Sequence, residues 1–488
     1  MRSRIQSCAM IRRDWRIRHS EFAAEEKKMS GTTQSGLSFV LVATMVFPTV
    51  WCSAFPPVLE AQNQPGQNAV CTSSSGCSTT VGTNAFIDAS VFLGSGQNQG
   101  SDVCDVIYKI LSGRTGITYP PNGAVVDARG VNSTNSSLTC AKGTPWFESS
   151  TGSVNVPSTI LLPAGTILIP TPWVLPPSTH LFGQGDNPSS GTVIQACTST
   201  TCPGNSFSGS SLIQFGNTLC LNTGCLSVSL EKLILDGKGQ QISGIINQYS
   251  SASYVDHVSL YQILGTGLSL SGSASNSGPY TNINFDTGGY SGLAGTVCAS
   301  INGLTNTRGI RGLSCTSRNG ANASAAVLLD SPSNLIKDVT IVGFYDGILV
   351  GENAPAQSNV LVNVIGDTSC VICGTTPIRA IHISSIQTGG ANNVQELSIL
   401  GVANDVSGTY TIWDDLTGAQ IQDPFVGLYV LGKPANNGYA RFTTSTGRPT
   451  WEVGTVAPST SAACTKGSMY SCTGSSSSCT AFALWRCG

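Results

Sequence analysis

Charged side chains are scarce in this sequence. Asp, Glu, Lys and Arg make up only 10% of the 488 residues, and the formal net charge is −2. So few cations exclude the basic stripe of a nucleic-acid-binding protein, and so few charges argue against long surface helices, whose outer faces are normally charged. Disorder is excluded as well, because 40% of the residues are apolar and disordered chains are polar and strongly charged.

Residues 37–47 form an apolar run that is too short for a membrane-spanning helix, which takes about 20 residues. Small residues and prolines follow it, so we interpret residues 1–61 as a leader and signal peptide with cleavage near Ala61. Met29 is an alternative start, and a lipoprotein anchor at Cys52 or an uncleaved N-terminal membrane anchor are the alternatives to cleavage. The expected location is secreted or cell-surface, with no membrane span in the mature chain.

Cysteine, in contrast, is plentiful. Of the 18 cysteines, Cys8 and Cys52 fall in the predicted leader, and the remaining even set suits disulfides in an oxidising compartment. Close spacing predicts four local pairs: Cys71/Cys77, Cys197/Cys202, Cys220/Cys225 and Cys370/Cys373. Four more cysteines cluster near the C-terminus: Cys464, Cys472, Cys479 and Cys487. Zinc at Cys370 and Cys373 is disfavoured, because no second CxxC accompanies them, and no metal site is predicted.

A repeat runs through the middle of the chain. Seven short segments share an apolar, small polar, apolar frame, at steps of about 23 to 35 residues. They are 233–235, 258–260, 283–285, 313–315, 339–341, 362–364 and 397–399. The middle position is small and polar in six of the seven, so it should face water while its neighbours face a core.

A glycine-led second strand follows most of these segments, at Gly244, Gly267, Gly292 and Gly347. Two or three short strands per step of about 25 residues are typical of one coil of a parallel β-helix, whereas a propeller blade needs about 40 residues and four antiparallel strands. We therefore predict an all-β fold, a single-stranded parallel β-helix over residues 85–419.

The ends of this solenoid have different patterns. Residues 101–112 have helical apolar spacing with Ser101 as the expected N-cap, and this helix should cap the N-terminal end. Residues 62–84 are interpreted as a flexible lead. Residues 420–488 lose the repeat and gain aromatic residues, which predicts a small Cys-rich β module.

Three stretches resemble the opening coils of pectate-lyase-like proteins, the pectin lyase fold. They are residues 124–130, residues 159–167 with the Pro-x-Gly turn at 163–165, and the Gly-x-Gly and Thr-x-Ile elements at 183–185 and 192–194. The resemblance covers about residues 85–415 and implies a right-handed parallel β-helix, in agreement with the usual crossover rule. Because this fold hosts many functions, it is more specific for the fold than for the activity.

The resemblance implies a polysaccharide partner, with two classes of function. One is a lyase or glycoside hydrolase acting on uronate-rich glycans; the other is a noncatalytic glycan-binding or adhesin-like β-helix. The histidine and Arg-Ile-Lys motifs of polygalacturonases are absent, and Asp414-Asp415 falls after the last predicted rung. Residues 254–257 resemble the Trp-Ile-Asp-His segment of pectate lyases, with Tyr in place of Trp. A lyase would imply calcium; no other cofactor is indicated.

Two columns of polar residues are expected to stack. Asp236, Tyr261 and Asp286 follow the first strand on consecutive rungs, so two rungs separate the aspartates by about 10 Å, near the spacing of an inverting glycosidase. We predict Asp236, Asp286 and Arg311 as catalytic residues. The alternative is that each aspartate only binds turn amides.

A second column precedes the same strand and contains Glu231-Lys232, Asp256-His257, Arg311 and Lys337-Asp338. Its mixed signs fit an ion-pair ladder, or an acidic-sugar site in which Arg311 holds a carboxylate. We predict Tyr261, Asp256 and His257 as substrate-binding residues. His382 lies in an apolar strand, which favours a buried or turn-bonded histidine over a catalytic one.

Overall fold

The computed structural model describes residues 86–431 apart from gaps at 95–98, 115–123, 133–137, 150–151, 218–224, 273–275, 304–306, 319–324, 368–377, 389–390 and 405–408. Beyond these it describes the backbone of four strands, at 439–443, 451–454, 469–472 and 484–486. The predicted leader, the signal peptide and the lead at 62–84 lie outside the described residues. So do Cys71, Cys77, Cys220, Cys370 and Cys373.

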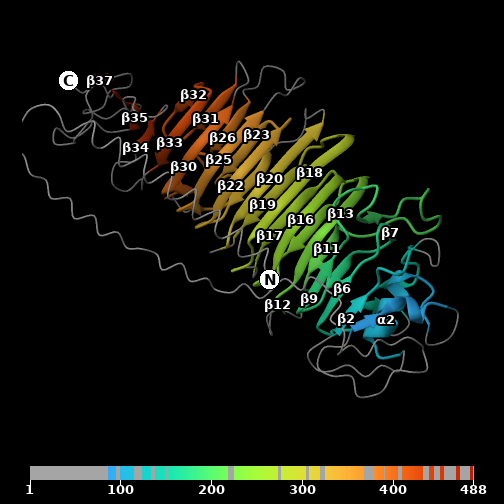
Figure 1. The fold of residues 1–488 in the computed structure, drawn as a ribbon. Coiled ribbons are helices and arrows are strands. Elements are labelled where there is room, and N and C mark those ends of the chain that lie inside the picture. Colours follow the sequence, from blue (N-terminus) through green and yellow to red (C-terminus); the bar gives the residue numbers. More distant parts are fainter. Residues whose placement is uncertain are drawn as a thin grey trace, which may run out of the picture. The chain divides into compact units, whose positions relative to one another are not determined.

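Two long sheets of parallel strands run through the described residues (Figure 1). In the first sheet each strand pairs in parallel with the next in chain order. These strands are β2 (Ala124–Asp127), β6 (Ser158–Leu161), β9 (Thr179–Phe182), β13 (Ser229–Gln240), β16 (Tyr254–Ile263), β18 (Tyr280–Ser291), β20 (Ile310–Arg318), β22 (Leu335–Val342), β25 (Val360–Asp367) and β30 (Leu397–Asn404). Strand β1 (Phe86–Asp88) pairs with β2, and β7 (Gly165–Ile169) and β10 (Thr192–Ala196) join beside β13.

The strands of the second sheet lie between those of the first along the chain, and they also pair in parallel up to β31. They are β8 (Trp173–Leu175), β11 (Ser211–Phe215), β14 (Ser243–Asn247), β17 (Thr266–Ser271), β19 (Val297–Asn302), β21 (Ala325–Asp330), β23 (Asp346–Val350), β26 (Arg379–Ile383) and β31 (Tyr410–Asp414). From β13 to β31 the long strands alternate between the two sheets, so neighbours in either sheet belong to successive coils. The all-β prediction is confirmed, and the parallel sheets are compatible with a solenoid.

The inward columns confirm the register of the first five predicted triplets. Leu233, Val258, Ile283, Leu313 and Val339 pair in sequence on neighbouring strands, and each is at most 1% exposed. Their side chains fill one continuous apolar core between the sheets.

The sixth and seventh predicted triplets are out of register. Val339 pairs with Val364 and not with Val362, and Val364 pairs with Val402 and not with Leu397. In each case the predicted triplet begins before a bend in its strand, and the true inward position follows that bend.

The bend is made by one residue with left-handed backbone at the same position of each coil. The φ angles lie between 52° and 73°. The residues are Lys232, His257, Asn282, Gly312, Asp338, Asn363 and Gly401. Asn, Asp, His and Gly adopt this conformation more readily than other residues do. The bend interrupts the pleat of the strand. The residue two positions before the left-handed residue and the residue one position after it both face the core. The alternation of inward and outward side chains is therefore shifted by one residue at each bend.

Three of the four predicted glycine-led strands are confirmed, but their glycines are required for close contact between coils and not for a bend. A Cβ on Gly244 would lie 2.6 Å from the Gly267 carbonyl oxygen, and one on Gly347 would lie 2.3 Å from the Ala380 oxygen. Glycine is therefore needed because successive coils approach closely. The fourth prediction is wrong: Leu293 after Gly292 is exposed, and the strand of that coil is β19.

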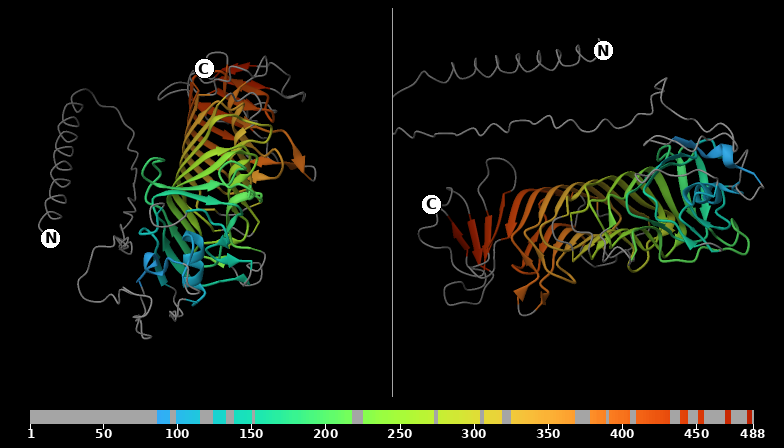
Figure 2. Two further views of the ribbon diagram at one scale, coloured as in Figure 1. Left: turned by 90° about the vertical axis from the view of Figure 1, so that its right-hand side faces the viewer. Right: turned by 90° about the horizontal axis from the view of Figure 1, so that it is seen from below.

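Helix α2 (Val103–Leu111) lies next to β2 at the N-terminal end of the described sheets, as predicted (Figures 1 and 2). Its N-cap is Asp102, whose side chain accepts from the Asp105 amide, so Ser101 as N-cap was wrong. Every residue of α2 is buried. A three-stranded antiparallel sheet adjoins it, formed by β3 (Gly143–Thr144), β4 (Phe147–Glu148) and β5 (Gly152–Ser153).

Three disulfides join described residues. Cys197–Cys202 confirms a predicted pair, whereas Cys104–Cys140, which ties α2 to the following segment, and Cys298–Cys315, which links β19 to β20, were not predicted. Both partners of Cys298–Cys315 are fully buried, so this bond joins a strand of each sheet inside the protein.

The C-terminal strands continue the first sheet, and all of their pairings are antiparallel except that of β35 with β36, which is parallel. Strand β33 (Phe425–Leu431) pairs with β30, and β34 (Tyr439–Thr443), β35 (Trp451–Gly454), β36 (Met469–Cys472) and β37 (Leu484–Arg486) follow in turn. The small module predicted over residues 420–488 stays a prediction, because the side chains of its four cysteines lie outside those described. No helix among the described residues is long and apolar enough to cross a membrane.

Candidate functional site

The outward residues just before the bend form a single column on the first sheet. We call it the bend column, and it consists of Glu231, Asp256, Thr281, Arg311 and Lys337, which pair on successive strands. Neighbouring strands lie about 4.8 Å apart, so the five side chains follow one another along the stack. The column changes from acidic through neutral to cationic within about 20 Å.

Glu231 lies in a half-buried network of hydrogen bonds. The Tyr254 hydroxyl donates to its Oε1 at 2.6 Å. The Ser229 hydroxyl lies 3.5 Å from the same oxygen and 2.8 Å from Nδ1 of His180. Burial and the charge of Asp256 raise the pKa of the Glu231 carboxyl, although the Tyr254 hydrogen bond opposes the shift. Glu231 is therefore biased toward its protonated form, and burial with the Glu231 contact raises the pKa of Tyr254 to about 12.

The pKa of Asp256, one strand further along, is shifted in the opposite direction. Partial burial alone would raise its pKa, but hydrogen bonds from Thr281, His257 and Asn282 outweigh burial and lower it. His257 Nδ1 lies 2.8 Å from Oδ2, and the Asn282 amide donates to Oδ1 at 3.0 Å. His257 and Asn282 are bend residues on adjacent strands, so the left-handed positions deliver two of the three donors that lower the pKa of Asp256.

Arg311 and Lys337 supply the cationic end of the bend column. Both are exposed, and Arg311 forms no ion pair with any residue that the structure describes. Lys337 pairs only with its neighbour Asp338, at 3.6 Å on the surface, where such pairs contribute little. These two cations are available to an acidic ligand.

A second column lies at the other end of the same strand segments. We call it the turn column: Asp236, Tyr261 and Asp286 pair on successive strands, and Thr316 follows. Of the six predicted site residues, the structure therefore brings together Asp236, Tyr261 and Asp286 in one group and Asp256, His257 and Arg311 in another. About five residues of strand, roughly 16 Å, separate the groups.

The carboxylates of the turn column are occupied by local backbone. Asp236 is 4% exposed, accepts from the Lys238 amide at 2.9 Å and pairs with the Lys238 ammonium at 3.0 Å. Asp286 accepts from the Gly288 amide at 2.7 Å and lies 3.5 Å from Arg318. Each aspartate accepts an amide of the irregular segment that interrupts its strand just after it, which agrees with the alternative that it binds only local backbone amides.

Exposed tyrosine rings accompany the turn column. Tyr261 is 38% and Tyr290 is 41% exposed. A Cβ on Gly239 would lie 2.4 Å from the Tyr290 ring, and one on Gly288 would lie 3.1 Å from the Tyr261 ring. The glycines therefore let both rings lie against the backbone, where their outer faces remain open to a planar or ring-shaped ligand.

The sequence reasoning missed a third polar group, on the second sheet. His382 contacts Asp346 at 3.2 Å and Asp415 at 2.9 Å, and Arg379 pairs with Asp346 in a bidentate contact. Burial would lower the pKa of His382, but the two carboxylates raise it. The Trp413 indole also donates to Asp415. These contacts occupy both ring nitrogens of His382, which agrees with the structural role expected for it.

Asp414 differs from a solvated turn residue. It is 1% exposed and accepts from the Thr417 hydroxyl and from Tyr429. Its carboxyl therefore stabilises the chain after β31 and faces no ligand.

No group of three or more His, Cys, Asp or Glu side chains that could hold a metal ion occurs within the described part of the chain. The calcium of a lyase would lack a ligand set among these residues. In comparisons with known proteins, no family model matches the sequence, and no curated protein matches it either.

Proposed function

We propose that this chain is a secreted, polysaccharide-active, right-handed parallel β-helix of the pectate-lyase-like kind, and that it cleaves a uronate-rich glycan at the bend column. The observation that carries the proposal is the pair Glu231 and Asp256: two carboxyl groups on neighbouring strands whose pKa values are shifted in opposite directions. Opposite shifts in one site are the signature of an acid and its partner carboxylate. The three disulfides support an extracellular location.

The roles follow from the directions of the two pKa shifts. Protonated Glu231 donates its proton to the glycosidic oxygen as the bond to the leaving sugar breaks. Asp256 attacks the anomeric carbon as its carboxylate and forms a glycosyl ester. Water then hydrolyses this ester, and Glu231, now deprotonated, takes a proton from the water, which releases the sugar and restores both carboxyl groups. Neighbouring strands are about 4.8 Å apart, near the roughly 5 Å carboxyl separation of retaining glycosidases. This strand spacing is compatible with hydrolysis by a pair of carboxyl groups.

The cationic end of the bend column supports an acidic substrate. Arg311 lies two strands beyond Asp256 and Lys337 three. A guanidinium binds a carboxylate through two parallel hydrogen bonds. A uronate chain lying along the stack would place a carboxylate at Arg311 while a glycosidic bond lies at Glu231.

The test is an assay of the secreted protein for new reducing ends, and for unsaturated uronate products, on a panel of uronate-rich polysaccharides with and without calcium. We expect reducing ends without unsaturated products, and a loss of at least about 100-fold in kcat for Glu231→Gln and Asp256→Asn. Glu396→Gln, an exposed carboxylate outside the bend column, is the matched control and should retain activity. Full turnover in both bend-column variants would contradict the assignment.

A noncatalytic glycan-binding protein is the second candidate, and the tyrosines of the turn column favour it. These exposed rings can stack on sugars, and the carboxylates beside them are bonded to backbone amides, so the sugar would be bound but not cleaved. For this candidate no polysaccharide of the panel is cleaved, and Tyr261→Ala and Tyr290→Ala weaken glycan binding while Glu231→Gln leaves it unchanged.

A further inference from the structure

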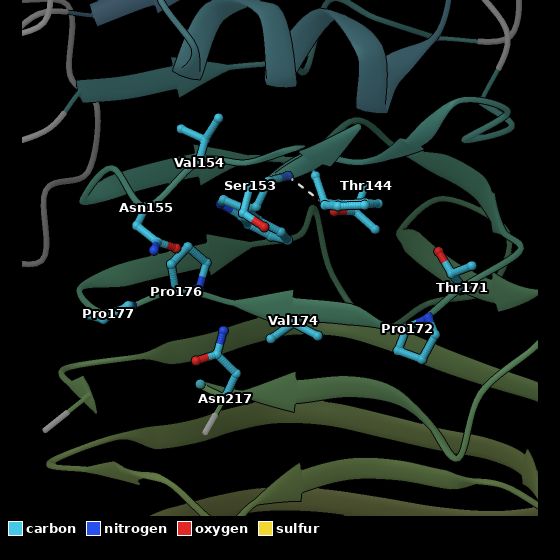
Figure 3. A pocket seen from close by; sticks show the side chains of 13 residues that line it. Thr144, Ser153, Val154, Asn155, Thr171, Pro172, Val174, Pro176, Pro177 and Asn217 are labelled. Atoms are coloured by element: carbon cyan, nitrogen blue, oxygen red, sulfur yellow. Dashed lines mark hydrogen bonds between the residues drawn. The ribbon is translucent and has the colours of Figure 1, made fainter. Parts of the chain in front are cut away.

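A pocket lies at the N-terminal end of the second sheet, apart from both columns. It has a volume of about 380 Å³, within the range of small-molecule sites. Figure 3 shows Val154 and Asn155 on one side of it and Val174, Pro176 and Asn217 on the other. The first side follows β5, and Val174 belongs to β8, the edge strand of the second sheet.

Packing and hydrogen bonds outside the pocket fix the positions of its walls. The Trp146 and Trp173 rings contact each other edge to face, with centroids 5.8 Å apart, and join the small sheet to β8. Tyr108 of α2 donates to the Gly152 carbonyl of β5. A Cβ on Gly209 would lie 2.3 Å from the ring of Pro172, so that proline is fixed by close backbone contact. The pocket is thus formed before any ligand arrives.

The described residues that line the pocket carry no charged side chain. None of its residues is Asp, Glu, Lys, Arg or His; they are Thr144, Trp146, Phe147, Ser153, Val154, Asn155, Thr171, Pro172, Val174, Pro176, Pro177, Gly216 and Asn217. Flat apolar surfaces come from Phe147 and three prolines, and polar groups come from amides and hydroxyls. Phe147 is 46% exposed, and a large exposed apolar ring at a pocket is typical of a binding surface.

The polar groups of the lining suit a hydroxyl-bearing ligand. Asn155 and Asn217 supply amides, and Thr144, Thr171 and Ser153 supply hydroxyls. Each of these groups can donate to or accept from a sugar hydroxyl.

We propose that this pocket binds one neutral pyranose unit, with an apolar ring face against Phe147 and hydroxyls toward Asn155 and the Thr and Ser side chains. A uronate is disfavoured, because its carboxylate would enter a site without a cation and lose hydration without compensation. The pocket therefore selects a different sugar from the one that the bend column is proposed to cleave, and it would anchor the protein to a neutral part of a mixed glycan.

The experiment uses the full secreted protein and two sugars that differ only at C6, methyl galactoside and methyl galacturonide, with methyl glucoside, mannoside and xyloside as further probes. Binding is measured by saturation-transfer NMR and calorimetry. We expect at least one neutral glycoside to bind, and the galacturonide to show no saturable binding at this pocket. Phe147→Ala should weaken binding at least about tenfold, and Asn155→Ala about fivefold, the usual effect of one hydrogen bond.

Leu293→Ala is the matched control, since Leu293 is also an exposed apolar side chain but lies far along the chain on another coil, and it should leave binding unchanged. Both pocket residues are partly exposed, so the variants should fold, which a thermal melt confirms. Three results would overturn the proposal: no neutral glycoside binds at 50 mM, the galacturonide binds equally well, or Phe147→Ala has no effect.

Discussion

The two ends of the same strand segments carry carboxylates that stack equally well but differ in what surrounds them. Asp236 and Asp286 in the turn column each accept the backbone amide two residues further on. Glu231 and Asp256 in the bend column bond to side chains only, and their pKa values are shifted in opposite directions. Stacking is common to both columns, so it cannot by itself identify a site.

The difference lies in the backbone at each end. After Asp236 the chain turns, and turn amides take up the nearest acceptor. At the bend, one left-handed residue per coil redirects the chain without exposing amides to Asp256, and its own side chain becomes a donor, as His257 and Asn282 show. A carboxylate there stays available for a ligand. A carboxylate that bonds to side chains is a candidate for a functional site, and one that bonds to backbone amides is structural. Its position in the repeat does not distinguish the two.

Both columns depend on which side chains face the core in the strand segment between them. A charge placed at an inward position of this segment should lower the unfolding free energy more than any other change. Leu260 is fully buried and Ser259 beside it is partly exposed. Leu260→Asp places an unpaired charge in the core and should cost more than about 4 kcal/mol of unfolding free energy. Ser259→Asp should change it by about 0.5 kcal/mol or less.

Denaturant or thermal unfolding of the two variants provides the measurement. Similar destabilisation by both variants would mean that inward and outward side chains alternate differently along this strand. The residues assigned to the bend column and to the turn column would then be wrong.

Removing the turn-bound carboxylate should have an intermediate effect. Asp236→Ala leaves the Lys238 amide without its acceptor in a nearly buried turn, which should cost about 1–3 kcal/mol. Asp236→Asn keeps an oxygen acceptor and should cost less. Glu231→Gln, which removes no backbone contact, should be closer to wild type in unfolding free energy. If Asp236→Ala were as stable as Glu231→Gln, the turn column would have no structural role to distinguish it.

The smallest expected effect is on the pH dependence of stability, where the two bend-column carboxyls should act in opposite directions. Asp256 has a lowered pKa, so it stabilises the fold above its unfolded value of about 3.9, and this contribution is lost as pH falls through the folded pKa. Glu231 has a raised pKa, so the folded state holds its proton longer, and stability falls as pH rises from about 4.3 through the folded pKa.

Unfolding free energies of wild type, Asp256→Asn and Glu231→Gln between pH 3 and pH 8 measure these slopes. Asp256→Asn should lose less stability in acid than wild type, and Glu231→Gln should lose less as pH rises. Identical profiles for all three proteins would show that neither carboxyl is perturbed.

Much of the fold could be predicted, because apolar–polar–apolar triplets recur wherever a strand has one wet face. The prediction failed where Val360 to Val364 are nearly all apolar around Asn363. The left-handed backbone at Asn363 shifts the alternation there, and composition alone does not reveal it. Residues such as Asn282, Asp338 and Gly401 at one position of successive coils are the signal that could have located the bend.

The site was predicted only in part. The stacking of Asp236 with Tyr261 and Asp286 follows from the repeat, and so does the neighbourhood of Asp256 and Arg311. The pKa of Glu231 depends on burial and on Tyr254, and the group around His382 depends on Asp346 and Asp415 from separate coils. Such contacts arise from side-chain packing, which a repeat pattern does not specify.

The central claim is that the pKa values of Glu231 and Asp256, on neighbouring strands, are shifted in opposite directions. Selective ¹³C labelling of Glu and Asp, with assignment through Glu231→Gln and Asp256→Asn, lets NMR follow each carboxyl through a pH titration without any substrate. The account predicts a Glu231 pKa above the usual value for glutamate and an Asp256 pKa below that for aspartate. Two ordinary values, or the reverse order, would contradict it.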